Sequence, residues 1–250
     1  MFGDQMPVSM RAQTAGTQKG AQVAECSRCA MRLTSFCGAL PGAALETLAL
    51  SRNRARFNKR QTIVCEGEPG TLLFNVTSGV VKLIRSSPDG RAQIVGFRVP
   101  GEFFASPTEE KYTFTAVAVT DVEICRFTRQ QLKRLWSEWP DLLERLFTMS
   151  CAQLTSNEEQ MFLLGRKTAR EKVASFLLTY ANRTACDNQD SMRLINLPMT
   201  RVEIADFLGL TIETVSRVFS SLVDEGMISV GISRSVRFMD LQALSRAAGD

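Results

Sequence analysis

The 250-residue chain is 44% hydrophobic and 22% charged, with a formal net charge of +4, which is typical of a soluble globular protein with one large or two modest domains. The complete absence of histidine excludes Ser/His and Cys/His catalysis, histidine-ligated zinc and a histidine pH switch. No stretch approaches about eighteen uninterrupted apolar residues and no apolar secretion signal begins the chain, so we expect a cytoplasmic protein with no membrane partner.

The first forty residues contain no periodic apolar pattern. Residues 1–20 are rich in Gln, Gly, Thr and Ser and predict a disordered tail. Residues 21–40 carry the cysteines Cys26, Cys29 and Cys37. The chain has seven cysteines in all, and in a cytoplasmic protein metal binding or redox chemistry is a better explanation for them than a disulfide framework.

Residues 41–135 show the pattern of a small β domain. Short apolar or alternating runs such as 72–76 and 80–85 are separated by turn sequences, among them Ser87-Pro88-Asp89-Gly90 and Pro100-Gly101. Strands of four to seven residues at this spacing predict a β-barrel or β-roll. We interpret this region as a sensor domain.

Residues 138–166 predict one long helix with a heptad seam. Positions in the seam are spaced alternately by four and three residues, and they are Leu143, Phe147, Ser150, Leu154, Asn157, Met161 and Leu164. One interpretation is a core helix that lies on its own domain. The other, which we favour, is pairing with the same helix of a second subunit, where Ser150 and Asn157 would weaken the dimer while fixing its register.

Residues 167–250 predict a winged helix-turn-helix. Thr200 and Glu203 form a capping box at the start of a short helix, Gly209 supplies the turn, and Thr211 caps a second helix that ends near Gly226. Two segments, 227–230 and 235–238, flank a loop and predict the hairpin that forms the wing. The fold class is therefore α+β: a β-roll, a dimerisation helix and a winged helix-turn-helix.

The second helix has a polar face with the chemistry of base recognition. Arg217 can pair with guanine O6 and N7, Glu213 can accept from cytosine N4, and Ser216 suits a base edge or a phosphate. The alternative is an ordinary solvated helix face. With Arg234 of the wing as a phosphate contact, the candidate DNA-binding residues are Thr211, Glu213, Ser216, Arg217, Ser220 and Arg234.

The sequence resembles the CRP/FNR family of bacterial regulators over nearly everything after the tail. The similarity is strongest in LPMTRVEIADFLGLTIETVSR, SPDGRAQIVGFRVPGEFF and FLLGRKTAREKVASFLL, and it points to the FNR, FixK and FnrN branch. The resemblance implies a homodimer that binds a palindromic double-stranded DNA site and works with RNA polymerase. It also implies that Glu213, Ser216 and Arg217 read TTGA-type half-sites.

The family contains members that bind cyclic nucleotides, and we do not expect this chain to be one of them. Those members have an arginine followed by Ser or Thr after the Gly-Glu pair. Here Gly101-Glu102 is followed by no arginine before Lys111. A cyclic phosphate would therefore lack its counter-charge and its bidentate donor.

The resemblance instead implies a [4Fe–4S] cluster that supports dimerisation when oxygen is scarce. Iron–sulfur clusters are commonly held by four thiolates. Cys26, Cys29 and Cys37 would supply three, and the alignment places Cys125 at the fourth position, with Cys65 as the competitor. Cys151 and Cys186 are expected to be structural.

Several alternatives to the oxygen-responsive cluster stay open at this point. They are a four-thiolate zinc site, free thiols, a thiol-redox or constitutive regulator, and an iron–sulfur redox enzyme. A redox enzyme would not need a two-faced DNA-reading helix, and no nucleotide loop or nucleophile elbow is present. The family often has a charged residue in this part of its dimer helix, whereas Asn157 is neutral. We therefore expect the dimer to persist more in air than the family pattern implies.

Overall fold

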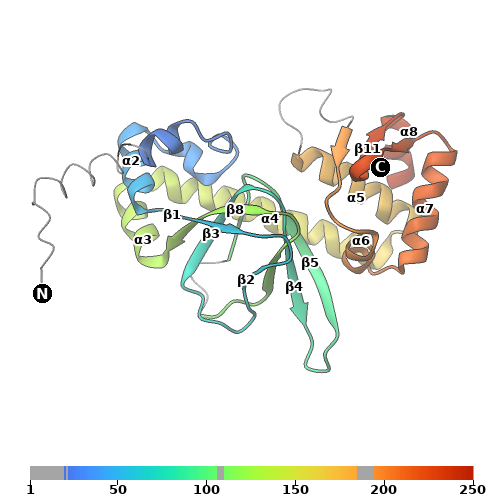
Figure 1. Cartoon of the computed structure of the whole chain (residues 1–250), viewed down its shortest axis with the longest axis horizontal. Coiled ribbons are helices and arrows are strands. Elements are labelled where there is room, and N and C mark those ends of the chain that lie inside the picture. The colour runs from blue at the N-terminus through green and yellow to red at the C-terminus, as the bar shows by residue number, and fades with distance from the viewer. Residues whose placement is uncertain (1–19, 21, 106–109, 185–193, 250) are drawn as a thin grey trace, which may run out of the picture.

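A computed structural model describes residues 20, 22–105, 110–184 and 194–249. The fold consists of an N-terminal β-roll and a C-terminal helical domain, joined by one long helix that runs behind the roll (Figure 1). The predicted α+β architecture is confirmed. The tail predicted over 1–20, apart from Gly20, and Cys186 lie outside the described residues.

The segment before the roll is helical. Residues 22–27 form a helix, followed by the 3-10 helix η1 (Phe36–Ala39) and by α2 (Gly42–Ser51). The sequence analysis expected short strands from residue 41 onward, and this was wrong for α2. The sequence GAALETLALS is rich in Ala and Leu, the strongest helix formers, and Pro41 at the N-cap begins the helix.

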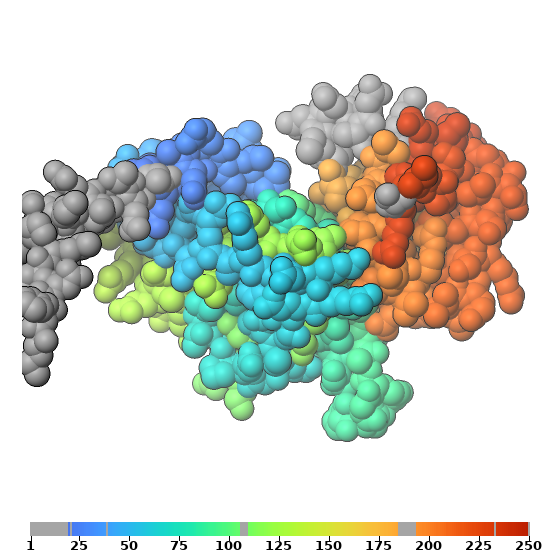
Figure 2. All heavy atoms as spheres, viewed as in Figure 1, coloured from blue at the N-terminus to red at the C-terminus, as the bar shows by residue number. Residues whose placement is uncertain are grey.

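The predicted β-roll is present and consists of two four-stranded sheets, in the orders β1-β8-β3-β6 and β2-β7-β4-β5. All of its strand pairs are antiparallel. The strands are β1 (Asn53–Phe57), β2 (Thr62–Val64), β3 (Leu72–Ser78), β4 (Val81–Ser86), β5 (Ala92–Arg98), β6 (Phe103–Phe104), β7 (Thr115–Ala118) and β8 (Val122–Thr128). Figure 2 shows the N-terminal segment against the roll and the β4–β5 hairpin protruding from the body.

Two helices follow the roll. Thr128 and Gln131 form a capping box at the start of α3 (Arg129–Glu138). The helical conformation is interrupted at Trp139, and α4 (Pro140–Arg166) begins at the next residue. Proline fits the first helical turn because its missing N–H would be unpaired there anyway. None of the described helices is long and apolar enough to cross a membrane.

The C-terminal domain has the predicted winged helix-turn-helix. It contains α5 (Ala169–Thr184), α6 (Arg201–Leu208), α7 (Ile212–Asp224) and α8 (Leu241–Ala248), with a three-stranded sheet of β10 (Ile228–Val230), β11 (Ser235–Phe238) and β9 (Leu194–Asn196). Gly209 ends α6 with φ +61°, a left-handed conformation that glycine adopts without steric cost.

The two domains share one apolar core. Val80, Ile94 and Phe97 of the roll pack with Phe176 and the core of the C-terminal domain. Two polar contacts also join the domains. Lys82 Nζ forms an ion pair with Glu203 Oε1 at 2.9 Å, and the backbone N–H of Ile94 donates to Asp206 Oδ2 at 3.0 Å.

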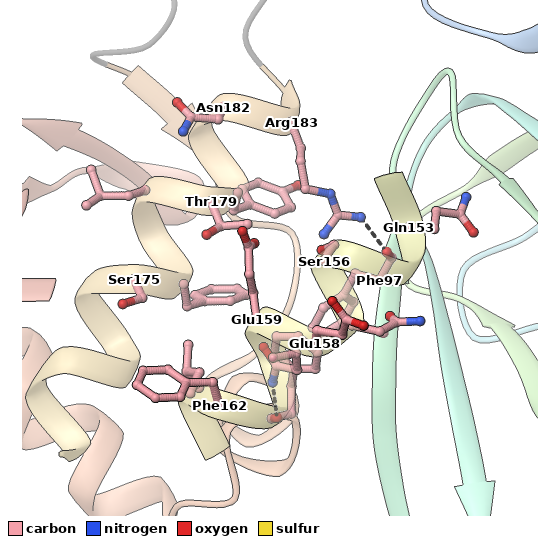
Figure 3. Close-up of a pocket in the computed structure, with 18 of the residues that line it drawn as sticks. Phe97, Gln153, Ser156, Glu158, Glu159, Phe162, Ser175, Thr179, Asn182 and Arg183 are labelled. Carbon is pink, nitrogen blue, oxygen red and sulfur yellow. Dashed lines mark hydrogen bonds between the residues drawn. The ribbon is translucent and has the colours of Figure 1, made fainter. Parts of the chain in front are cut away.

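A groove of about 840 Å³ lies beside this contact, between β5, α4 and α5. Figure 3 shows Arg183 crossing it from α5 to the carbonyl of Phe97, a bond of 2.6 Å. The two domains are therefore held together by polar as well as apolar contacts.

Candidate functional site

Helix α7 has a buried face and an exposed polar face. Val215, Phe219 and Leu222 are buried, which fixes the helix on the domain. The side chains of Glu213, Ser216, Arg217 and Ser220 are exposed. Their spacing of three and four residues places them on one side of the helix, as required of a surface that enters a DNA groove.

The start of α7 is set by local hydrogen bonds. Thr211 Oγ1 accepts from the backbone N–H of Thr214 at 3.2 Å. The backbone N–H of Glu213 and the Thr211 hydroxyl both donate to the Glu213 carboxylate and lower its pKa. Glu213 is therefore ionised at neutral pH and can accept a hydrogen bond from a base.

The guanidinium of Arg234, which was predicted to contact a phosphate, already has a hydrogen-bond partner within the chain. Arg234 is exposed and lies at the end of η3 (Ile232–Arg234) with φ +65°, but its Nη1 donates to the carbonyl of Pro198 at 2.9 Å. This bond ties the wing to the loop before α6. A phosphate contact by Arg234 would have to share or replace it.

The sequence analysis did not identify Arg201, the first residue of α6, which contacts the buried face of α7 through Phe219. Its guanidinium carbon lies 3.1 Å from the ring centroid of Phe219. Burial, together with the nearby positive charge of Arg234, lowers the pKa of Arg201 to about 10. The capping box correctly predicted the helix start at Arg201, but it carries no signal for a contact with a residue of the next helix.

Helix α4 has two apolar faces. Leu142, Leu146 and Leu163 are buried in their own chain. Most of the heptad residues face outward instead: Phe147 is 68% exposed, Leu154 59% and Met161 65%, and Leu143, Ser150 and Asn157 are also exposed. Leu164 alone is half-buried and packs against the C-terminal core. The heptad face is therefore not the one that covers the chain's own roll.

Four cysteines line a single cavity of about 360 Å³. Cys26, Cys29 and Cys37 come from the N-terminal segment, and Cys125 comes from β8. Cys65 is exposed just after β2 and does not line this cavity, and Cys151 is exposed on α4. The number and kind of donors match a four-thiolate site, but within the described residues no group of three or more His, Cys, Asp or Glu is arranged to hold a metal ion.

Burial favours the protonated form of three of the cavity thiols, those of Cys26, Cys37 and Cys125. It raises the pKa of Cys26 to about 11 and raises that of Cys37 and of Cys125 as well. The positive charge of Arg52 partly offsets this effect at Cys26 and Cys125. A metal that binds here must therefore displace protons.

The cysteine segment packs directly on α4. Phe36, Cys125, Leu142 and Leu146 belong to one buried cluster, against which Cys26 and Cys37 also pack. Arg145 Nη2 of α4 donates to the carbonyl of Leu33 at 3.4 Å. A change in the cysteine segment is thus adjacent to the N-terminal half of the long helix.

The roll, the long helix with its exposed apolar face and the winged helix-turn-helix define a DNA-binding transcription regulator. Comparison with known families agrees, because residues 54–138 match the cyclic nucleotide-binding domain and residues 171–247 match the Crp-like helix-turn-helix domain. The chain belongs to the CRP/FNR family, in its FixK/FNR branch.

Relatives over most of the chain are named as regulators. The chain is 38% identical to the nitrogen fixation regulation protein FixK of Bradyrhizobium diazoefficiens, over 82% of this chain and 86% of the relative. It is 34% identical to the transcriptional activator protein FnrL of Cereibacter sphaeroides, over 90% of this chain and 92% of that protein. The structure of FixK2 from Bradyrhizobium japonicum matches 78% of this chain and 96% of its own, with a TM-score of 0.72 and 32% identity.

Proposed function

We propose that this protein is a cytoplasmic, homodimeric transcription activator that binds palindromic TTGA-type sites, acts with RNA polymerase and responds to oxygen through a [4Fe–4S] cluster. Cys26, Cys29, Cys37 and Cys125 would hold the cluster. The observation that carries the proposal is that these four cysteines line one cavity next to the helix that bears the exposed heptad face.

The DNA-reading assignment is supported by the exposed polar face of α7. Glu213 and Arg217 are four residues apart in the N-terminal half of the helix, the part that helix-turn-helix proteins insert into the major groove. Their side chains are exposed, and no described neighbour packs over them. A carboxylate and a guanidinium in this position can discriminate C and G edges.

The homodimer is supported by the exposed heptad face of α4. A monomer would leave the apolar side chains of Leu143, Phe147, Leu154 and Met161 in water. Exposed apolar surface of this extent, aligned along one helix, is typical of an interface. A two-fold dimer would also place two copies of α7 on the two halves of a palindrome.

The cofactor assignment is supported by the donor set and by the shared core. Four cysteine thiols line one cavity, which matches the ligand count of such clusters, and a bound [4Fe–4S] cluster supplies a redox-active centre. The segment with Cys26 and Cys37 packs on Leu142 and Leu146, so its position bears on the pairing face of α4. A marginal interface needs only a small bias to change its population.

A cyclic nucleotide is not part of the proposal. The interior of the roll is occupied by an aromatic cluster in which Phe74 stacks on Phe104 at 4.9 Å and also contacts Tyr112. Phe114 packs edge-on against Phe104. This cluster and the missing arginine after Gly101-Glu102 both disfavour a bound cyclic phosphate.

A gel-shift experiment on a TTGA-containing palindrome tests the proposal. Anaerobic protein should shift the palindrome, should shift a scrambled site weakly, and should lose affinity on exposure to air. Equal binding before and after air would leave the DNA-binding regulator but refute the oxygen response. One zinc and no iron in the anaerobic protein would refute the cluster.

A further inference from the structure

The buried residue Arg52 joins the cysteine segment to the body of the roll. Its side chain is only 5% exposed. Nη1 lies 3.9 Å from Cys125 Sγ, while Nη2 donates to Glu25 Oε2 at 2.6 Å and to the carbonyl of Gln22 at 3.2 Å. One guanidinium thus contacts the fourth cysteine and the residues just before the first.

The neighbouring arginines of β1 share this arrangement only in part: Arg54 also binds Glu25 Oε2, at 3.0 Å, and lines the cavity, but its side chain is 42% exposed. Arg54 and Arg56 both pair with Glu123 on β8 and are much more exposed, and Arg56 does not line the cysteine cavity. Arg52 is distinguished by its burial and by its Nε, which is buried without a hydrogen-bond partner. A buried guanidinium stays charged, and an incompletely compensated buried charge is costly.

The charged residues around the cavity indicate which side chain could compensate the negative charge of bound thiolates. The charged side chains that line it are Glu25, Arg28, Arg52, Arg54 and Glu123. Glu25 is about half exposed and Glu123 is already shared by Arg54 and Arg56. Four metal-bound thiolates would add negative charge to this apolar cavity, and Arg52 is the buried cation within hydrogen-bonding distance of one of the sulfurs.

We propose that Arg52 is a positioning residue for the cysteine site, which fastens the segment carrying Cys26 beside Cys125 and supplies the positive charge that an anionic thiolate-ligated group needs. This inference rests on the proposed cluster function. It adds a residue outside the ligand set and predicts that the segment is held before any metal binds.

The test compares the wild type with Arg52→Gln, Arg52→Lys, Glu25→Gln and the control Arg56→Gln. Arg56→Gln removes one positive charge from the adjoining strand β1, at a residue that does not line the cysteine cavity. Glu25→Gln weakens the same tether from its exposed side: it removes the carboxylate that binds Arg52 and Arg54 but keeps the Arg52 guanidinium beside Cys125. Gel filtration and circular dichroism confirm that each variant is folded.

The first measurement uses metal-free full-length protein and trypsin. Arg28 and Arg32 lie within the cysteine segment, so cleavage after them reports its opening. We expect Arg52→Gln and Glu25→Gln to be cleaved there roughly five- to tenfold faster than the wild type. Arg56→Gln should match the wild type.

The second measurement is iron and sulfide content after anaerobic incubation with ferrous iron and sulfide. The wild type and Arg56→Gln should each take up about four irons per chain. Arg52→Gln should retain less than half as much, and Arg52→Lys should fall between. Wild-type iron content in Arg52→Gln, or equal losses in Arg52→Gln and Arg56→Gln, would overturn the role of Arg52 alone. A wild type that takes up no iron would overturn the proposed cluster and this inference with it.

Discussion

Truncating Leu154 should break the dimer without unfolding the subunit, and truncating Leu146 should do the reverse. Burying a large apolar side chain contributes about 1.5–3 kcal/mol, and Leu154 is 59% exposed in the single chain. Each copy of Leu154→Ala should therefore lose about 1–1.5 kcal/mol at a two-fold interface. For the dimer this is about 2–3 kcal/mol, a roughly 30- to 150-fold weaker Kd.

The matched change, Leu146→Ala, lies on the adjacent, buried face of the same helix. Leu146 is 6% exposed and belongs to the core beneath the cysteine segment. Its truncation should lower the free energy of unfolding by about 2–4 kcal/mol and leave the intrinsic pairing face intact.

Sedimentation equilibrium measures the dimer Kd of both variants, and urea denaturation measures their unfolding. If Leu154→Ala stayed fully dimeric and Leu146→Ala became monomeric while folded, the assignment of the two faces would be refuted. A large loss of subunit stability in Leu154→Ala would also contradict an exposed position.

The remaining predictions concern DNA reading, the dimer and pH. Arg217→Ala should cost about 1–3 kcal/mol at the cognate palindrome and relax discrimination at one guanine; unchanged preference in a binding-site selection would refute its role. Asn157→Leu should tighten the dimer and make DNA binding in air closer to anaerobic binding, as gel shifts on both preparations would show; a weaker dimer would contradict the heptad register. The Arg170 guanidinium binds Glu225 through two bonds of 2.6 Å and lowers its pKa from 4.5 to about 2. Because the folded-state pKa is depressed, this pair stabilises the fold above pH 4.5 and the contribution is lost as the pH falls toward 2. Glu225→Gln should therefore lower Tm at pH 7, with a difference that shrinks below pH 4.5; a constant difference would mean that Glu225 acts through its shape instead.

The C-terminal domain could be predicted from sequence because its signals are local. The capping box at Thr200 and Glu203, the glycine turn at Gly209 and the cap at Thr211 each act within a few residues. All three are present in the structure. The exposed heptad face of α4 also has a local signal, because the alternating spacing of four and three residues places Leu143, Phe147 and Leu154 on one side of the helix.

Other features depend on contacts between distant parts of the chain. Arg52 lies 27 positions from Glu25 and 73 from Cys125, and nothing in the local sequence RNRARF distinguishes it from Arg54 or Arg56. The convergence of Cys125 with the N-terminal cysteines was likewise predicted through the family resemblance and not from spacing. Helix α2 was not predicted because the β domain, whose strands begin at Asn53, was predicted to begin at residue 41.

Single cysteine substitutions test most directly whether Cys26, Cys29, Cys37 and Cys125 hold an iron–sulfur cluster. Iron and acid-labile sulfide should be measured in protein purified anaerobically as the wild type, as Cys125→Ser and as Cys65→Ser. Because Cys125 lines the cavity and Cys65 does not, we predict about four irons per chain in the wild type and in Cys65→Ser, and almost none in Cys125→Ser. Full iron content in Cys125→Ser, or loss of iron in Cys65→Ser instead, would contradict the assigned site.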